Sequence, residues 1–170
     1  FAILDIDSEN LFLARDAFGV KPLYFCSENH VFSFASEIKA LLKFHSISKE
    51  LNQDALNRYL SFLWCPGDGT PFKSIKKLLP GEAIIVKNGQ IQEQWTWYQL
   101  PIFRGVKADL TEAESIIGTS SYLRQAVHRQ LISDVPLGAF LSGGLDSASI
   151  VCLNRKIIGN KKEYNTFTGI

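Results

Sequence analysis

The residues best suited to chemistry lie in one short segment, Ser142 to Ser147, where glycines, serines and an aspartate follow an apolar run. Gly143 and Gly144 carry no Cβ, so an anion can approach their backbone N–H groups closely. Ser142 and Ser147 add hydroxyl groups that can donate hydrogen bonds. A loop of this composition predicts a binding site for phosphate.

Two elements must position this loop. Residues 135–141 are apolar and too few for a helix, so we expect a buried strand. Residues 148–153 continue with an apolar face that is typical of a helix. The loop would then lie between the carboxyl end of a strand and the amino end of a helix. Unpaired N–H groups and the positive end of the helix dipole converge there on a bound anion.

Asp146 is the one acidic residue of the loop. A carboxylate repels a phosphate unless a divalent cation lies between them, so we expect Mg²⁺ with Asp146 as a ligand. The pattern G-x-x-x-x-G-K-[ST] is absent, which argues against a kinase or GTPase of that type. The alternative is that Gly143 and Gly144 only make a turn, but a turn needs neither the hydroxyls nor the carboxylate.

The segment around this loop, SDVPLGAFLSGGLDS at residues 133–147, closely resembles the pyrophosphate loop of glutamine-hydrolysing asparagine synthetases. Upstream, residues 14–25 and 34–41 resemble the late part of a class II glutaminase domain. Similar glutaminase segments occur in amidophosphoribosyltransferases, and the downstream loop decides between the two families. The chain is identified as a member of the asparagine synthetase family, and we expect it to be an internal fragment.

The resemblance implies two domains. Residues 1–100 would be the C-terminal part of an Ntn-type αββα glutaminase domain of the α+β class. Residues 111–170 would begin an α/β ATP-pyrophosphatase domain with a doubly wound parallel sheet. Residues 101–110 lack periodicity and contain Pro101 and Gly105, so we expect a linker there.

The resemblance also implies the chemistry. ATP would adenylate the aspartate side chain with release of pyrophosphate, and ammonia from glutamine would then form asparagine and AMP. Small-molecule substrates are the expected partners, and a homodimer is left open. The residues implied in binding ATP and pyrophosphate are Phe140, Leu141, Ser142, Gly143, Gly144, Asp146, Ser147 and Gly169.

No catalytic residue for glutamine hydrolysis is expected within the chain. The nucleophile of class II glutaminases is a cysteine at the mature amino terminus. Cys26, Cys65 and Cys152 cannot be that residue, and their wide spacing favours free thiols over a zinc site. Two alternatives stay open: an amide ligase or cyclase similar to β-lactam synthetase, and a non-catalytic remnant of the same architecture.

Composition excludes other classes of protein. The formal net charge is +1 and the basic residues are dispersed, which argues against nucleic acid as a partner. The densest basic stretch, residues 73–77, is interpreted as a solvated loop or helix face. No apolar run approaches the roughly 20 residues that span a bilayer, and we expect a cytoplasmic protein.

The first part of the chain predicts sheets with helices packed on them. Residues 1–7, 11–15, 20–25 and 31–35 are interpreted as strands of a β-meander. Ser36 and Asn52 are expected to cap two helices. On the second of these, an apolar face would comprise Leu56, Tyr59, Leu60 and Leu63.

Later segments carry stronger local signals. Asn88-Gly89 predicts a type I′ hairpin within residues 80–95. Thr111 and Glu114 predict a capping box, followed by a core-facing stripe of Ile116, Ile117, Leu123, Val127 and Leu131. Arg15 and Asp16 are expected to be structural, as an ion pair or through hydrogen bonds at a strand end.

Overall fold

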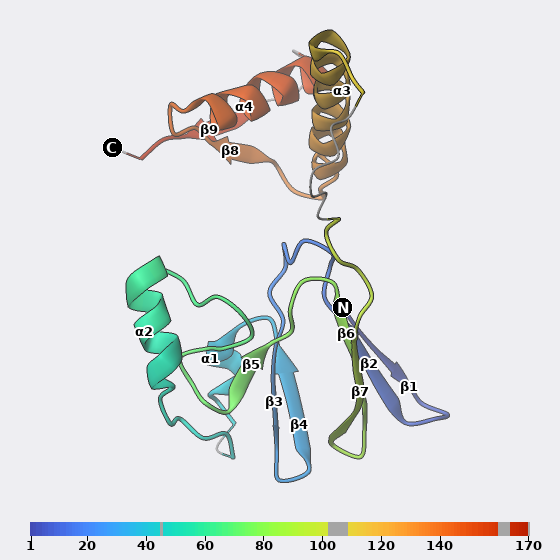
Figure 1. Ribbon diagram of the computed structural model, residues 1–170, viewed down its shortest axis with the longest axis vertical. Coiled ribbons are helices and arrows are strands. Elements are labelled where there is room, and N and C mark those ends of the chain that lie inside the picture. The colour runs from blue at the N-terminus through green and yellow to red at the C-terminus, as the bar shows by residue number, and fades with distance from the viewer. Residues whose placement is uncertain (45, 102–108, 160–163, 170) are drawn as a thin grey trace. The chain divides into compact units, whose positions relative to one another are not determined.

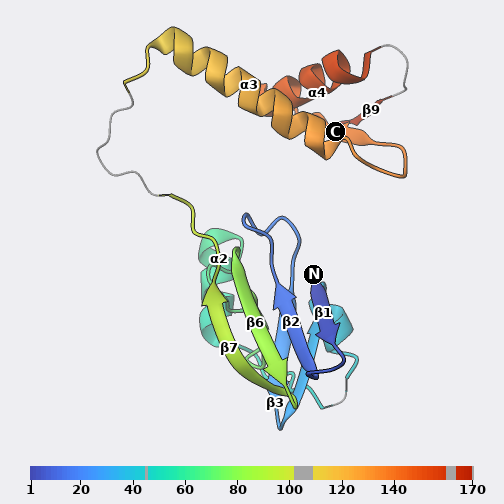
Figure 2. The same ribbon diagram turned by 90° about the vertical axis from the view of Figure 1, so that its right-hand side faces the viewer.

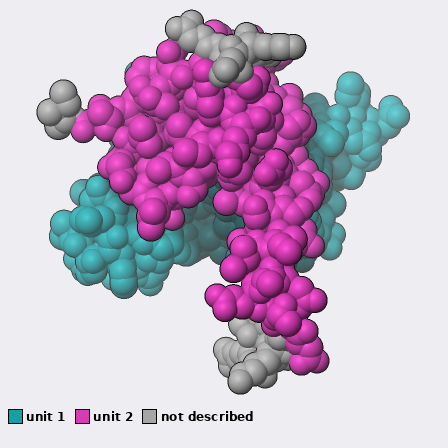
Figure 3. Space-filling model, turned by 90° about the horizontal axis from the view of Figure 1, so that it is seen from above, with its two compact units in different colours: residues 1–102 teal, residues 103–170 magenta. Residues whose placement is uncertain are grey.

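The computed structural model describes residues 1–44, 46–101, 109–159 and 164–169 (Figures 1 and 2). The chain divides into two compact units, residues 1–102 and 103–170, which Figure 3 colours separately. Each unit is described by itself. Most of the predicted linker, residues 101–110, lies outside the described residues.

Unit 1 contains two antiparallel sheets. The first has four strands in the order β1-β2-β6-β7, with bounds Ala2–Asp5, Asn10–Ala14, Glu82–Lys87 and Gln90–Thr96. The second has three strands in the order β4-β3-β5, where β3 is Tyr24–Glu28, β4 is Val31–Ala35 and β5 is Ile75–Lys77. The β-meander predicted for the first 35 residues is therefore wrong, because the β1–β2 and β3–β4 hairpins belong to different sheets.

The two sheets share one apolar core. Leu13 and Ile84 of the first sheet pack against Phe25 of the second. Leu78, which directly follows β5, belongs to the same cluster. Alternate residues of a strand point to opposite faces, so Cys26 belongs to a second cluster on the outer face of the three-stranded sheet. The helix α1, Ile38–Leu41, covers that face through Leu41. Unit 1 is thus layered as sheet, sheet and helix.

Strand β5 was not expected from the sequence. The charge of residues 73–77 predicts a solvated stretch, yet Ile75 is 1% exposed and pairs with Cys26. A single apolar residue among lysines is enough for a short strand here, because its neighbours on both sides can point to solvent. Lys73 and Lys76 make exposed ion pairs with Glu50 and Asp68.

One of the two predicted helix caps in unit 1 is confirmed. Asn52 caps α2, Gln53–Phe62, by accepting a hydrogen bond from the backbone N–H of Ala55 at 3.2 Å. The capping role expected for Ser36 is wrong, because Glu37 occupies the N-cap position of α1 and makes no side-chain cap bond.

The predicted apolar face of α2 is not buried. Only Ala55 of this helix is buried, whereas Leu60 is 76% and Leu63 is 81% exposed. The outer face of the three-stranded sheet is already covered by Leu41 and Ile47. Leu60 and Leu63 therefore have no uncovered sheet surface to pack against in the described part of unit 1.

The predicted hairpin of β6 and β7 is confirmed. Asn88 and Gly89 have φ values of 51° and 72°, the left-handed conformation that a type I′ turn requires at both central positions. Gly89 is also required for space, since a Cβ there would lie 1.8 Å from the carbonyl oxygen of His30.

Unit 2 contains a β-α-β arrangement preceded by a long helix. The elements are α3, β8, α4 and β9, with bounds Glu112–Gln130, Gly138–Phe140, Leu145–Ile158 and Asn165–Phe167. Strands β8 and β9 are parallel, as expected for an α/β unit. Residues of α3, α4 and β8 line a common cavity in this unit. The doubly wound sheet stays a prediction. Among the described residues, no helix is both long and apolar enough to cross a membrane.

The capping box of α3 is confirmed, but most of its predicted core-facing stripe is exposed. Thr111 Oγ1 accepts from the N–H of Glu114 at 3.3 Å, and the Glu114 carboxylate accepts from the N–H of Thr111 at 2.8 Å. Val127 is buried and Leu131 is half-buried, whereas Leu123, Ile116 and Ile117 are 38%, 61% and 69% exposed. Ser149 and Leu153 of α4 lie across an open pocket from the early turns of α3, which leaves Ile116 largely exposed.

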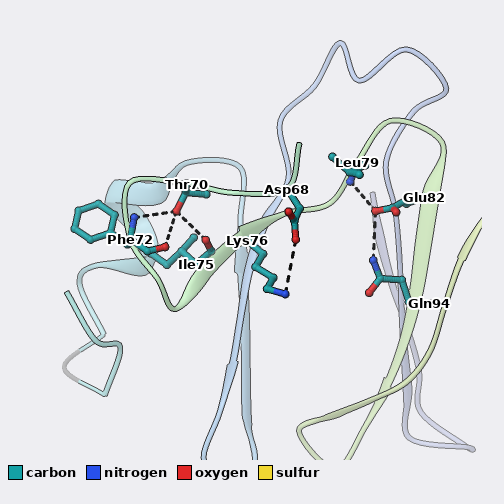
Figure 4. A network of polar contacts seen from close by, with 8 residues as sticks. All are labelled: Asp68, Thr70, Phe72, Ile75, Lys76, Leu79, Glu82 and Gln94. Atoms are coloured by element: carbon teal, nitrogen blue, oxygen red, sulfur yellow. Dashed lines mark hydrogen bonds and ion pairs between the residues drawn. The ribbon is translucent and has the colours of Figure 1, made fainter. Parts of the chain in front are cut away.

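A buried hydroxyl organises the turn that leads into β5 (Figure 4). Thr70 is 1% exposed, and its Oγ1 lies 2.7 Å from the carbonyl oxygen of Ile75 and 3.0 Å from that of Phe72. The same oxygen accepts from the N–H of Phe72 at 3.2 Å. One buried side chain thus satisfies backbone groups of both Phe72 and Ile75.

The end of β2 is closed by a cation and a carboxylate. The Arg15 guanidinium donates to the carbonyl oxygens of Lys21, Leu78 and Gly19 at 3.0, 2.7 and 2.9 Å. The Asp16 carboxylate accepts from the N–H groups of Phe18, Val20 and Lys21. The structural role predicted for both residues is confirmed in its hydrogen-bonded form.

We predict that Thr70→Val lowers the free energy of unfolding by about 1–3 kcal/mol, because the N–H of Phe72 loses its buried acceptor. Chemical denaturation measures this. The control Thr70→Ser keeps the hydroxyl and should lose only about 1 kcal/mol for the missing methyl group. A larger loss in the serine variant than in the valine variant would contradict the assignment.

A second prediction concerns acid stability. The N–H of Lys21, assisted by those of Val20 and Phe18, holds the pKa of Asp16 below its ordinary value of 3.8. The ionised group therefore stabilises the fold above that pH, and the contribution disappears as pH falls through the lowered pKa. Denaturation as a function of pH should show a flatter acid limb for Asp16→Asn. Parallel curves for the two proteins would refute this.

Candidate functional site

The carboxyl ends of β8 and β9 meet at one edge of unit 2. Phe140 pairs with Phe167 in parallel register. The N–H of Leu141 donates to the carbonyl oxygen of Phe167 at 2.7 Å, and Thr168 Oγ1 donates to the carbonyl oxygen of Leu141 at 2.7 Å. Gly169 follows directly, so the structure brings the end of β9 beside the loop at residues 142–147. This is the edge at which α/β sheets bind ligands.

The loop opens straight into α4. Gly143 has a φ of 82°, and a Cβ at this position would meet nothing within 4 Å, so the backbone faces open space. Helix α4 begins at Leu145, three residues before the predicted segment, with Gly144 at the N-cap. No side chain caps this helix. The N–H groups of its first turn are therefore presented to an anion together with the helix dipole.

The two loop serines are bonded to each other. Ser142 Oγ lies 3.0 Å from Ser147 Oγ, which also accepts from the N–H of Ser142 and donates to the carbonyl oxygen of Gly144, both at 3.2 Å. A hydroxyl has one proton, so this arrangement uses both protons inside the loop. Backbone N–H groups can donate to an anion without rearrangement, whereas the hydroxyl group of either serine must rotate before it can donate.

Asp146 lies in the first turn of α4 and is exposed. A carboxylate at a helix amino terminus is favourable by itself. It can also ligate Mg²⁺, which commonly takes one or two protein carboxylates and completes its shell with phosphate oxygens and water. No group of three or more potential ligand residues for a metal occurs among the described residues. As a single carboxylate, Asp146 therefore suits a Mg²⁺ ion that binds together with a phosphate ligand. It does not suit a metal ion whose ligands all come from the protein.

The strand before the loop is shorter and more exposed than predicted. Of residues 135–141, only Gly138–Phe140 form a strand, and Phe140 is 85% exposed. Its ring centroid lies 6.4 Å from that of Phe167 with a 58° tilt. The buried strand expected here is wrong because β9 is its only strand neighbour in the described unit. The two rings form an open apolar ledge, and Leu141 beside them is half-buried.

Sequence reasoning missed two residues at this edge. Phe167 makes the second half of the ledge, and Thr168 ties the end of β9 to Leu141. A hydroxyl residue directly after an apolar strand position was the available signal for Thr168. Gly138 is also needed locally, because a Cβ there would lie 2.7 Å from the carbonyl oxygen of Asn165.

The predicted free thiols are confirmed. Cys26 is buried, Cys65 is half-buried and Cys152 is exposed, and all three are free. Burial raises the pKa of the Cys26 thiol, which disfavours the thiolate that a nucleophile needs. The absence of a glutamine-hydrolysing residue among the three cysteines stays a prediction from the sequence.

Comparison with known proteins also divides the chain into two parts. The family described as glutamine amidotransferase domain matches residues 1–98, and the family described as asparagine synthase matches residues 119–169. Asparagine synthetase [glutamine-hydrolyzing] 3 of Bacillus subtilis is 34% identical over 155 residues, which cover 90% of this chain and 24% of that protein. Asparagine synthetase [glutamine-hydrolyzing] 2 of the same organism is 31% identical over 179 residues, covering 98% of this chain and 23% of that protein.

A relative with a different printed name also matches. Amidase chry2 of Gibberella zeae is 30% identical over 151 residues, which cover 88% of this chain and 22% of that protein. The chain thus spans about a quarter of the length of these curated relatives.

We predict opposite effects for two glycine substitutions in unit 2. Gly143→Ala should lower the free energy of unfolding by about 1–2 kcal/mol, because φ at this position is left-handed. Gly118→Ala, in the interior of α3 with nothing within 4 Å of its added Cβ, should raise it by about 1 kcal/mol. Thermal unfolding measures both, and a stabilised Gly143→Ala variant would show that the loop does not hold this conformation.

Proposed function

The chain belongs to the glutamine amidotransferase domain family and continues into a segment of the asparagine synthase family, and on this basis we propose that it is part of a glutamine-dependent asparagine synthetase. The sheet, sheet and helix layers of residues 1–102 support their assignment to the C-terminal part of an Ntn-type αββα glutaminase domain. Residues 111–170 would begin the doubly wound ATP-pyrophosphatase domain.

The proposed reaction has two steps. An oxygen of the aspartate side chain attacks the α-phosphorus of ATP, the bond from that phosphorus to the bridging oxygen breaks, and pyrophosphate leaves with the electron pair. Ammonia from glutamine then attacks the acyl carbon, the carbon–oxygen bond to AMP breaks, and a proton is lost to give asparagine. Negative charge accumulates on the leaving pyrophosphate, so donors are most effective there.

One observation carries the proposal: an uncapped helix amino terminus, a glycine loop and a carboxylate share the carboxyl edge of β8 and β9. The N–H groups of Gly143, Gly144 and the first turn of α4 would bind the pyrophosphate. Ser142 and Ser147 would donate after rotating out of their mutual hydrogen bond. Mg²⁺ held at Asp146 would supply charge that backbone dipoles cannot.

The nucleotide base would occupy the apolar side of the same edge. Phe140 and Leu141 precede the loop, and Gly169 would place its backbone near the base at the end of β9. The exposure of Phe140 and its contact with Phe167 support this arrangement, since an aromatic ledge favours a planar ring. The cytoplasmic location and the homodimer stay predictions from the sequence.

A second candidate keeps the adenylation and changes the acceptor. The match to amidase chry2 favours this possibility, because that relative shares the same segments under another name. The acceptor could then be another carboxylic acid, or an amine within the same molecule as in β-lactam synthetase. A non-catalytic remnant would retain the architecture without turnover.

The test uses the intact protein that contains this chain, incubated with ATP, Mg²⁺, aspartate and either glutamine or ammonia. We predict AMP, pyrophosphate and asparagine as products, and a loss of at least about a hundredfold in turnover for Asp146→Ala. Asp109→Ala, an exposed carboxylate outside the loop, should retain the activity and serves as the matched control.

Other outcomes separate the alternatives. Formation of AMP only with a different carboxylic acid would identify the second candidate. ADP as the product would exclude adenylation, and a folded protein without turnover of ATP would favour the non-catalytic remnant.

A further inference from the structure

Unit 1 contains a pocket of about 640 Å³ that the proposed synthetase reaction does not use. This volume lies within the usual range for sites that bind small molecules. Four aromatic residues line it, together with two cations and the turn at residues 67–71: the aromatics are Phe18, Tyr24, Tyr59 and Trp64, and the cations are Arg15 and Lys77. We call it the Lys77 pocket.

The two cations in this lining have no acidic counterpart there. Among the described residues that line the Lys77 pocket, none is aspartate or glutamate. The carboxylate of Asp68, which acts on Lys77 from outside the lining, lies 3.7 Å from the ammonium of Lys76. Arg15 and Lys77 therefore border the same space, and an anion bound between them would be attracted by both.

Arg15 is held rigidly in this position. Its guanidinium donates to three backbone carbonyl groups, which leaves two of its five N–H donors for other partners. The carbonyl dipoles fix the side chain but do not neutralise its charge. A preorganised cation costs little conformational entropy when it binds a ligand.

Lys77 is half-buried on β5 and only partly satisfied. Its ammonium donates to the carbonyl oxygen of Cys65 and lies 5.9 Å from the centroid of the Trp64 ring. Burial, together with the nearby charge of Arg15, lowers the pKa of Lys77, whereas Cys65 and Asp68 oppose this shift. A bound anion would relieve the repulsion between the two cations and stabilise the charged form.

We propose that the Lys77 pocket binds a small oxyanion that carries a ring, with its carboxylate or phosphate group between Lys77 and Arg15 and its ring against the aromatic wall. The aromatic residues provide apolar contact area, and the two cations fix the orientation of the charged end. The proposal does not depend on the function assigned to the loop at residues 142–147.

The test measures binding of three probes to the whole chain by isothermal titration calorimetry: phenylacetate, phenyl phosphate and the neutral phenylacetamide. We expect one or both anions to bind and the amide to bind at least about tenfold more weakly, because it lacks the charge. The preferred anion identifies the oxyanion as carboxylate or phosphate. Equal affinity for the amide, or no binding of either anion, would overturn the proposal.

The neighbouring lysine provides a matched control. Lys76 precedes Lys77 on β5, is exposed and does not line the pocket. We predict that Lys77→Met weakens binding of the preferred anion at least about tenfold, whereas Lys76→Met, which removes the same charge, changes it less than about twofold. Equal effects of the two substitutions would show that only the overall charge matters.

A measurement on the unmodified protein covers the case in which Lys77→Met does not fold. Limited acetylation with acetic anhydride, followed by peptide mass spectrometry, reports the reaction rate of each lysine. The preferred anion should slow acetylation of Lys77 and leave that of Lys76 unchanged. Equal rates at Lys77 with and without the anion would refute the site.

Discussion

Backbone N–H and C=O groups at the ends of strands and helices must find partners, and this requirement shapes both units of the chain. At the end of β2, Arg15 donates to three carbonyl groups and Asp16 accepts from three N–H groups. Before β5, the buried hydroxyl of Thr70 does the same within one turn. At these places side chains satisfy the backbone groups.

At the carboxyl ends of β8 and β9, the backbone groups are only partly satisfied by side chains. Thr168 and the N–H of Leu141 close the strand ends, but no side chain caps α4. The loop serines bond to each other rather than to the N–H groups of the helix. Open donors, a left-handed Gly143 and the charge of Asp146 therefore coincide at one place, and this coincidence distinguishes the edge from an ordinary helix start.

Satisfying the backbone also has an electrostatic consequence in unit 1. Carbonyl groups hold Arg15 in place without cancelling its charge, and Lys77 enters the same pocket from β5. The residues that close the strand ends thus leave an electropositive pocket with aromatic walls. The turn and the proposed binding pocket share the Arg15 side chain, because a guanidinium has more donors than the turn requires.

The sequence by itself determined the features that depend on a few neighbouring residues. The Asn88-Gly89 turn, the cap at Asn52, the capping box at Thr111 and the loop that opens into α4 all formed as predicted. Each requires particular residue types at fixed short spacings, and these interactions are satisfied within one or two turns of the chain.

Tertiary structure alone decided which surfaces meet. The β3–β4 hairpin entered a second sheet, Leu60 and Leu63 of α2 stayed exposed, and Ile116 of α3 was not covered. An apolar periodicity shows which face of an element can be buried, but it carries no information about whether a partner surface lies opposite. That depends on elements distant in sequence, and so does the approach of Arg15 and Lys77 to one pocket.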